Sequence, residues 1–177
     1  MIGGWGKGSG EDARTSDVEL VRLGSDTEEC DPPDLGNKIY MHESVTTSNV
    51  FNVTNVLTCG GAPLNAGTVY TNNCTLLTAT GELRSFPSMD CKRYEFQMVN
   101  INGTIFAVGG GGDCSSEIGS SGTMEILNVK PSLDKIPFTA QAHCVVAISE
   151  KIVVIGGIFG TTIPAGVRRN LCLYKIH

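Results

Sequence analysis

Short runs of alternating hydrophobic and polar residues recur along this chain, and several of them end at a pair of glycines. "NVLTC", "TIFAV" and "IVVI" come directly before three such pairs, whose first members are Gly60, Gly109 and Gly156. Alternation with a period of two is typical of a β-strand with one face in a core. The pairs lie about 50 residues apart, which predicts a repeated structural unit. A fourth pair, Gly3 and Gly4, follows only "MI".

A further alternating run follows each pair, at residues 17–23, 74–79, 123–129 and 170–176. Each of these runs predicts another strand. After it comes a proline-containing segment: "CDPPDLG" (30–36), "GELRSFPSM" (81–89) and "SLDKIPF" (132–138). Proline suits an edge strand, so each segment is expected to form an outer strand.

Hairpins precede the later glycine pairs. "EFQMVNINGTIFAVGG" predicts two strands joined at Asn102-Gly103, because Asn-Gly is a strong hairpin signal. "HCVVAISEKIVVIGG" has the same length and turns at Ser149-Glu150. "HESVTTSNVFNVTNVLTCGG" matches with about five residues inserted near the turn. This alignment places His42, Phe96 and His143 at one repeat position.

One unit is therefore a hairpin, a glycine pair, a loop, a strand and an outer strand. The predicted units span residues 1–38 (partial), 39–91, 92–138 and 139–177 (partial), all within one domain. Glycine is expected in the pairs, Gly60-Gly61, Gly109-Gly110 and Gly156-Gly157, because the chain turns tightly there and neighbouring backbones approach closely.

This arrangement resembles the kelch repeat of β-propellers. The resemblance is carried by the strand-Gly-Gly elements, the "VELVRL"-type strand and the segment "FPSM…KRYEF", with Arg93 at the usual arginine. It implies an all-β fold of kelch-type blades with four antiparallel strands each, forming about half a ring. The tryptophan that kelch repeats usually carry on the outer strand is absent, and Leu83, Asp34 and Asp134 lie near its position.

The charge balance argues against a nucleic-acid surface, because the net charge is −5 and no basic cluster exists. No run approaches the roughly 20 apolar residues needed to span a bilayer. We therefore expect neither a nucleic-acid partner nor a membrane span.

Seven cysteines are many for a reducing compartment, and an odd number leaves at least one without a partner in the chain. Cys59 and Cys74 lie on strands expected to be antiparallel neighbours, so a disulfide is predicted there, with two buried thiols as the alternative. Cys30 and Cys91 lie one repeat apart in linkers, and a bond between them across adjacent units is a further alternative.

The other cysteines carry weaker expectations. Cys144 and Cys172 lie in apolar strands and are expected to be small core residues. Cys114 lies in a glycine-rich loop and is the best candidate for a cysteine that lacks its partner. Glycosylation sequons at Asn52, Asn73 and Asn102 point, with the cysteines, to an extracellular or secretory-pathway location.

Catalytic signatures are missing from the sequence. There is no zinc-ligand spacing, phosphate-binding loop or nucleophile motif, so no metal, cofactor or enzymatic activity is expected. His42 and His143 are interpreted as structural. Kelch folds include a copper oxidase and a sugar epimerase, but no tyrosine, cysteine and histidine constellation can be assigned here.

A non-catalytic interaction module is the leading hypothesis, because loops on a rigid scaffold are natural contact sites. The expected contacts are the loops after the glycine pairs, at 62–72, 111–122 and 158–168. The last is apolar in part, which singles out the candidate contact residues Ile158, Phe159, Arg168 and Arg169. The two arginines are equally well explained as solvated surface.

The expected partner is a protein or a glycan, or the rest of the propeller in a longer chain. Two alternatives remain open at this point. One is part of a kelch-propeller enzyme, and the other is an intracellular substrate adaptor.

Overall fold

The computed structural model describes residues 2–5, 14–18, 39–48, 54–63, 69–114, 122–127, 132–135, 140–149, 151–159 and 171–175. Within these ranges every regular element is a β-strand and every strand pairing is antiparallel. The all-β antiparallel class predicted from the alternating runs is therefore confirmed.

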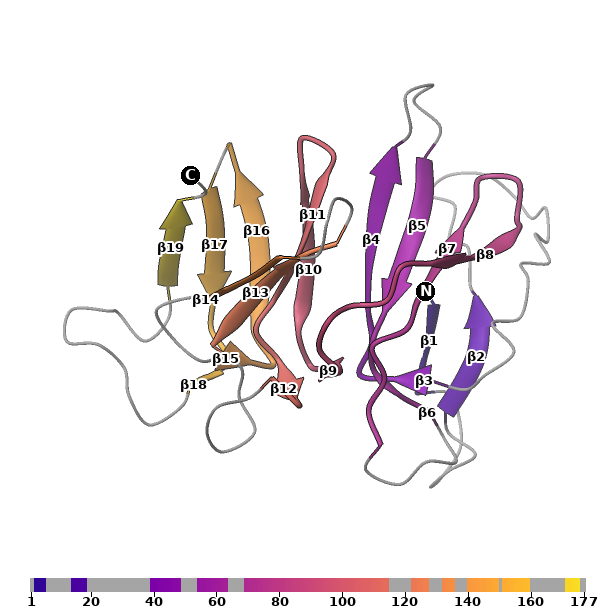
Figure 1. Cartoon of the computed structure of the whole chain (residues 1–177), viewed down its shortest axis with the longest axis horizontal. Coiled ribbons are helices and arrows are strands. Elements are labelled where there is room, and N and C mark those ends of the chain that lie inside the picture. Colours follow the sequence, from indigo (N-terminus) through magenta and orange to yellow (C-terminus); the bar gives the residue numbers. More distant parts are fainter. Residues whose placement is uncertain are drawn as a thin grey trace, which may run out of the picture.

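Two four-stranded sheets form the centre of the structure (Figure 1). The first sheet has the order β4-β5-β7-β8, and the second has the order β10-β11-β13-β14. Their bounds are β4 Glu43–Ser48, β5 Thr54–Cys59, β7 Cys74–Leu77, β8 Leu83–Phe86, β10 Gln97–Ile101, β11 Thr104–Val108, β13 Thr123–Ile126 and β14 Ser132–Lys135. The strand order predicted for one unit, from hairpin to outer strand, is present in both sheets.

The third sheet, β16-β17-β19, holds β16 Cys144–Ile148, β17 Lys151–Ile155 and β19 Leu171–Lys175. A two-stranded ribbon at the start of the chain holds β1 Ile2–Trp5 and β2 Arg14–Val18. The strand predicted at 17–23 thus starts earlier and is described only to Val18. The outer strand predicted at 30–36 lies outside the described residues.

Three very short strand pairs were not predicted. They are β3 (Ile39–Tyr40) with β6 (Ala62–Pro63), β9 (Arg93–Tyr94) with β12 (Gly111–Gly112), and β15 (Ala140–Gln141) with β18 (Ile158–Phe159). Each strand has two residues, which is too short for a period of two to show in the sequence. They lie at the same end of the three sheets, the lower end in Figure 1.

The hairpin turns follow the sequence signal. Asn102 (φ 51°) and Gly103 (φ 86°) both have positive φ, as a two-residue type I′ turn requires. Ser149, at the corresponding turn of the third sheet, has φ 56°.

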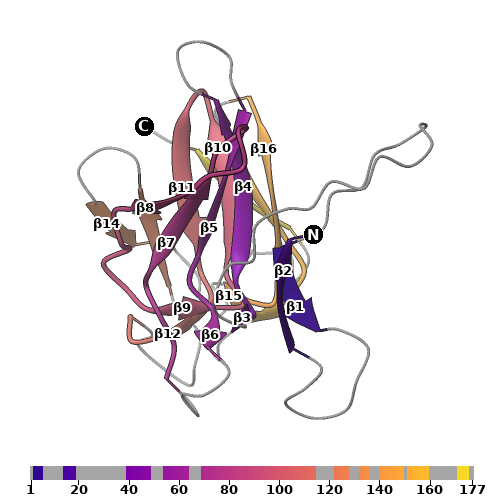
Figure 2. The same ribbon diagram turned by 90° about the vertical axis from the view of Figure 1, so that its right-hand side faces the viewer.

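The sheets pack face to face through their first strands, since β10 contacts β4 on one side and β16 on the other (Figures 1 and 2). One core cluster joins the first two sheets and includes Leu57, Phe96, Met98, Ile105 and Ala107. A second cluster joins the second and third sheets and contains Val99, Ile101, Phe106, Val108, Met124, Val145, Ile152 and Val154. Buried aliphatic side chains between sheets are thus the main source of stability.

A repeated backbone conformation marks the start of each sheet. Met41 (φ 57°), Glu95 (φ 51°) and Ala142 (φ 49°) directly precede the aligned His42, Phe96 and His143. The N–H of Glu95 donates to the Met41 carbonyl at 3.1 Å, and the N–H of Ala142 donates to the Glu95 carbonyl at 2.9 Å. These bonds form a belt of hydrogen bonds that crosses from each unit to the next.

Candidate interaction face at the glycine-pair end

The glycine pairs adopt conformations that other residues rarely do. Their φ angles are 69° and 86° in the first pair, 65° and 87° in the second, and 67° and 95° in the third. A Cβ placed on Gly110 would lie 2.6 Å from the Phe96 Cβ and 2.7 Å from the Tyr94 carbonyl oxygen. The pair therefore combines positive φ with close backbone approach, which only glycine tolerates.

The short strand pairs hold the start of each predicted contact loop. β6, β12 and β18 follow the glycine pairs directly, so the loops at 62–72, 111–122 and 158–168 all leave the sheets at this one end (Figure 1). Residues 64–68, 115–121 and 160–170 lie outside the described residues. We call this end of the molecule the glycine-pair end.

Predicted contact residues are only partly described. Ile158 and Phe159 form β18, where their backbones pair with Gln141 and Ala140. Arg168 and Arg169 lie outside the described residues, so their expected role stays a prediction.

Cys59 and Cys74 form a disulfide on adjacent strands. They are direct partners in the β5–β7 register, with Cα atoms 4.2 Å apart, and both are buried. The bond ties the last residue of β5 to the first residue of β7. It thereby closes the base of the loop between them.

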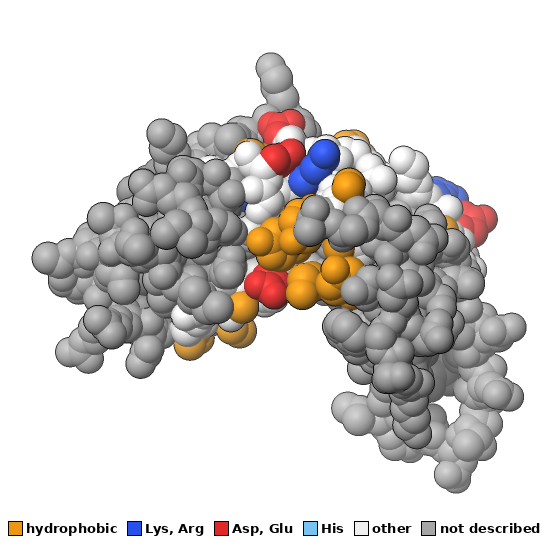
Figure 3. All heavy atoms as spheres, turned by 90° about the horizontal axis from the view of Figure 1, so that it is seen from below, with side chains coloured by type: hydrophobic (Ala, Val, Ile, Leu, Met, Phe, Trp, Pro, Cys, Tyr) orange, Lys and Arg blue, Asp and Glu red, His pale blue; other side chains and the backbone are white. Residues whose placement is uncertain are grey.

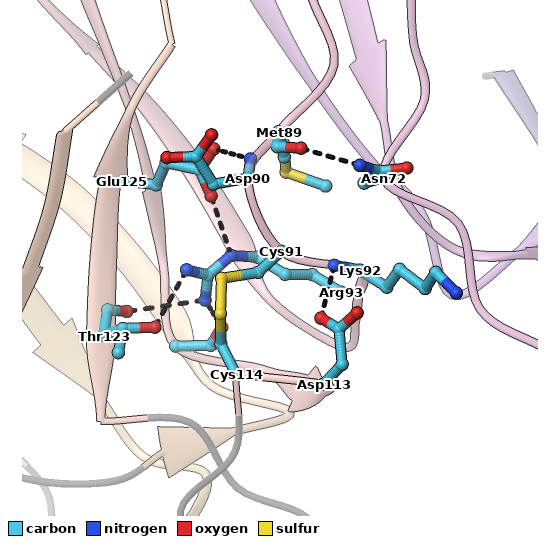
Figure 4. The surroundings of a disulfide bond; sticks show 11 residues. Asn72, Met89, Asp90, Cys91, Lys92, Arg93, Asp113, Cys114, Thr123 and Glu125 are labelled. Atoms are coloured by element: carbon cyan, nitrogen blue, oxygen red, sulfur yellow. Dashed lines mark hydrogen bonds and ion pairs between the residues drawn. A yellow bond between two sulfur atoms is a disulfide. The ribbon is translucent and has the colours of Figure 1, made fainter.

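A second disulfide joins Cys91 to Cys114, with Cα atoms 5.6 Å apart (Figure 4). The alternative bond between Cys30 and Cys91 is therefore wrong, and Cys114 does not lack a partner. The reason lies in the β9–β12 register, where Gly112 pairs with Arg93. Cys114 comes two residues after Gly112, and Cys91 comes two residues before Arg93. Antiparallel pairing therefore places Cys114 opposite Cys91.

Cys144 is not the core residue that the alternating pattern suggested. It is exposed and is the free cysteine of the described residues. Its strand is apolar on both faces, and Cys144 lies on the face away from the second sheet. Cys30 lies outside the described residues, and of Cys172 only the backbone, in β19, is described.

The donor atoms of Cys91, Asp113 and Cys114 lie within 4.8 Å of one another, as metal ligands would. Both sulfurs are already committed to the disulfide, and a disulfide sulfur is not the thiolate that binds metals. Asp113 Oδ1 accepts the Lys92 N–H at 2.7 Å. The cluster is therefore best explained as an anchor for the loop at 111–122.

An ion pair between Arg93 and Glu125 lies buried behind this disulfide (Figure 4). The Arg93 and Glu125 side chains are 1% and 0% exposed, and Arg93 Nε lies 3.6 Å from Glu125 Oε2. The arginine also donates to the Gly109 carbonyl at 2.7 Å and to Thr123 Oγ1 at 2.8 Å. Glu125 Oε1 accepts the Asp90 N–H. The pair thus holds the linker between units against β11 and β13.

Burial shifts the pKa of both groups of this ion pair. It raises the pKa of Glu125, while the Asp90 N–H and the Arg93 guanidinium act in the opposite direction. It lowers the pKa of Arg93, an effect that Glu125 offsets in part. Each charge is therefore costly to bury without the other.

The same linker is bonded to the unit before it. The Gly61 N–H donates to the Arg93 carbonyl at 2.8 Å. The Met89 N–H donates to the Asn72 carbonyl at 2.9 Å, and Asn72 Nδ2 donates to the Met89 carbonyl at 2.8 Å. The linker therefore fixes the loop base of one unit against the core of the next.

Hydrophobic side chains gather at the glycine-pair end, which Figure 3 views from below. Tyr70 and Tyr94 stack with ring centroids 3.9 Å apart. Val69 is 54% exposed and Met41 is 39% exposed. Burial, with a contribution from Tyr70, raises the pKa of Tyr94. An apolar and aromatic surface thus adjoins the loops.

The aligned histidines lie beside the cores. Burial lowers the pKa of His143 to about 4, and the nearby Val108 backbone opposes this shift in part. Phe96, at the same repeat position, belongs to the core between the first two sheets. His42 is half-buried. This environment suits the structural role predicted for the histidines.

Glu43 is a titratable group that the sequence did not single out. Burial raises its pKa to about 7, although the Ser44 backbone and Gln97 Nε2, which donates at 2.8 Å, stabilise the charged form. Glu43 and Gln97 hold the same repeat position on adjacent units. Only the packing of the two sheets brings them together.

Two of the three sequons fall in the described residues. Asn102 is exposed at the β10–β11 turn. Asn73 is exposed at the rim of a shallow depression of about 420 Å³ between β7 and β8. Asn52 lies outside the described residues.

Among the residues that the structure describes, none belongs to a helix long and apolar enough to cross a membrane.

Comparisons with known proteins give a likeness of fold. No family model matches the chain, and no curated protein matches it. A solved structure described as YjhT is similar to it, with a TM-score of 0.55 and 11% sequence identity. The match covers 69% of this chain and 46% of that one, so this chain spans less than half the length of that protein. What the two share is the arrangement of antiparallel sheets.

Proposed function

We propose that the chain is a non-catalytic interaction module, part of a kelch-type β-propeller, that binds a protein or glycan partner through the loops of its glycine-pair end. Three equivalent sheets packed side by side through β4, β10 and β16 support the propeller. The partial coverage of the larger YjhT structure is consistent with part of a ring.

One observation carries the binding proposal. Three successive units send their loops out at the same end, each from a strand pair that is fixed to a rigid sheet. The disulfide between Cys91 and Cys114 anchors one of these loops covalently. Loops held in this way present contact residues at little cost in conformational entropy.

An extracellular location belongs to the same proposal. Two disulfides in the described residues suit an oxidising compartment, and Asn73 and Asn102 are exposed for glycosylation. The partner is then expected among secreted or cell-surface proteins and glycans.

The test is a binding screen of the intact chain against a glycan panel and a display library of secreted proteins. A hit counts when replacing residues 115–121 with a Gly-Ser segment of equal length weakens binding at least tenfold and leaves the melting temperature unchanged. The matched control is Asn102→Asp, a change at the opposite end that a type I′ turn accepts. Binding that is lost with the control, or turnover of a sugar or copper-dependent oxidation, contradicts the proposal.

A further inference from the structure

Asn102 and Gly103 form the only Asn-Gly pair in the sequence, and they make the turn between β10 and β11. Both residues are exposed, and a Cβ placed on Gly103 would meet nothing within 4 Å. Asparagine is a thermolabile residue. It is most labile before glycine, because glycine has no side chain to shield its own backbone nitrogen. The turn therefore combines a reactive pair with free access for water.

The reaction open to this pair is intramolecular deamidation. The backbone nitrogen of Gly103 gives up its proton, attacks Cγ of the Asn102 side chain and forms a new C–N bond. The bond from Cγ to Nδ2 breaks, and ammonia leaves with the proton, so a five-membered succinimide ring remains. Water then opens the ring at either carbonyl, which gives aspartate or isoaspartate at position 102. The reaction consumes water and releases ammonia, and it needs no oxidant.

The folded turn holds the two reacting atoms apart. Asn102 has φ 51° and Gly103 has φ 86°, the signs that a type I′ turn requires. The first central residue of such a turn has a ψ of about 30°, the mirror image of type I. This angle places the Gly103 nitrogen on the opposite side of the Cα–C bond from the Asn102 Cβ, whereas the succinimide ring needs them on the same side. The hairpin must therefore open before the ring can close.

A neighbouring side chain also occupies the attacking nitrogen. The Gly103 N–H donates to Asn100 Oδ1 at 2.9 Å, which stabilises the protonated nitrogen over the form that attacks. Asn100 is itself held, because its Nδ2 donates to the Thr46 carbonyl of β4 at 2.9 Å. The packing of the first two sheets thus positions the residue that guards Gly103.

We propose that Asn102 is a site of spontaneous deamidation, which the folded hairpin suppresses through its turn conformation and through Asn100 as a positioning residue. Modification occurs only in the fraction of molecules whose β10–β11 hairpin is locally open. Asn102 also heads a glycosylation sequon. A glycan is carried on Nδ2 and deamidation expels Nδ2, so the two modifications exclude each other. The inference does not depend on the binding proposed for the glycine-pair end.

The two products differ in their effect on the hairpin. Aspartate keeps the length of the backbone, and a type I′ turn accepts it. Isoaspartate adds a carbon to the backbone of a two-residue loop whose flanking residues, Ile101 and Thr104, are paired. Ile101 is 8% exposed and belongs to the core between the second and third sheets. Isoaspartate at position 102 therefore works against the closed hairpin and loosens that core.

Asn73 provides an internal control in the same molecule. It is exposed like Asn102, but the residue after it is Cys74, which is buried and bonded to Cys59. The Asn73 carbonyl accepts the Gly60 N–H at 3.0 Å, so the backbone is held there as well. The cystine side chain shields the following nitrogen even in the unfolded chain. Asn73 is therefore expected to stay intact under conditions that convert Asn102.

The test follows the full chain, prepared without glycans, at mildly alkaline pH and physiological temperature. Peptide mass spectrometry measures the loss of asparagine at position 102, and isoaspartate methyltransferase labels the isoaspartate product. One sample stays folded, and the other is kept unfolded in guanidinium chloride with its disulfides intact. The unfolded chain is expected to deamidate at Asn102 at least tenfold faster than the folded chain.

Two variants at one position isolate the hydrogen bond to Gly103. Asn100→Ala removes the acceptor, and it is expected to raise the deamidation rate of the folded chain at least threefold. Asn100→Asp keeps an acceptor oxygen for Gly103 and loses the bond to Thr46, so it is expected to keep the slow rate. Urea unfolding of both variants measures any change in global stability. A rate that follows the acceptor, and not the free energy of unfolding, confirms the positioning role.

Three outcomes contradict the proposal. Equal rates at Asn102 and Asn73 in the unfolded chain would mean that the Asn-Gly pair has no special reactivity. Equal rates at Asn102 in the folded and unfolded chains would mean that the hairpin gives no protection. Equal rates in Asn100→Ala and Asn100→Asp would mean that the acceptor does not guard Gly103. None of these results bears on binding at the glycine-pair end.

Discussion

The buried ion pair of Arg93 and Glu125 gives the sharpest prediction for stability. The two side chains are 1% and 0% exposed, so removing one partner leaves a buried charge, at a cost of about 3–5 kcal/mol. Arg93→Met also removes hydrogen bonds to the Gly109 carbonyl and Thr123 Oγ1, so we expect about 5 kcal/mol for it. For Glu125→Leu we expect about 4 kcal/mol, since the Asp90 N–H also loses its acceptor.

The double variant, with both Arg93→Met and Glu125→Leu, should lose less stability than the sum of the losses of the two single variants. With no charge left in the core, a coupling energy of at least about 2 kcal/mol is expected. Urea unfolding followed by far-UV circular dichroism measures all four chains, and trimethylamine N-oxide keeps the weaker ones folded at the start.

The exposed pair of Arg84 and Glu82 is the matched control. Its side chains are 65% and 58% exposed, so Arg84→Met should change stability by less than about 0.5 kcal/mol. The reasoning would be refuted if the stability losses of Arg93→Met and Glu125→Leu summed to within about 0.5 kcal/mol of the loss measured for the double variant.

The remaining predictions concern backbone conformation and pH. Gly110→Ala should lower the free energy of unfolding, measured with urea, by more than about 3 kcal/mol. Gly81→Ala, at φ 84° with open space around it, should lower it by about 1–2 kcal/mol. Equal losses would show that the close backbone approach at Gly110 contributes nothing to stability. The folded pKa of Glu43, about 7, lies above the ordinary glutamate value of 4.5, so its contribution to stability is complete below pH 4.5 and is lost as pH rises through 7. Glu43→Gln should therefore flatten the fall in melting temperature between about pH 5 and pH 8, and an unchanged slope contradicts this. The folded pKa of His143, about 4, lies below the ordinary 6.5, so stability is complete above pH 6.5 and falls as pH drops toward 4. His143→Phe should weaken that acid sensitivity in thermal unfolding, and an identical acid midpoint would count against it.

Local signals in the sequence were enough for much of the fold. The alternating runs located the strands of the sheets, and Asn102-Gly103 located a turn, because strand period and turn chemistry are properties of neighbouring residues. The recurring glycine pairs then gave the order of strands within a unit. The pairing of Cys59 with Cys74 followed from that order alone.

The tertiary structure decided what depends on contact between segments far apart in the chain. The two-residue strands β9 and β12 carry no periodic signal, yet their register brings Cys91 to Cys114. The burial of Glu125 likewise arises where the linker between two units packs on β13, and the raised pKa of Glu43 arises where the first two sheets meet. Val99 and Val146 show the limit most clearly, since equivalent valines are buried in one sheet and exposed in the next. A strand's own sequence sets which face is apolar, but whether that face is covered depends on its neighbour.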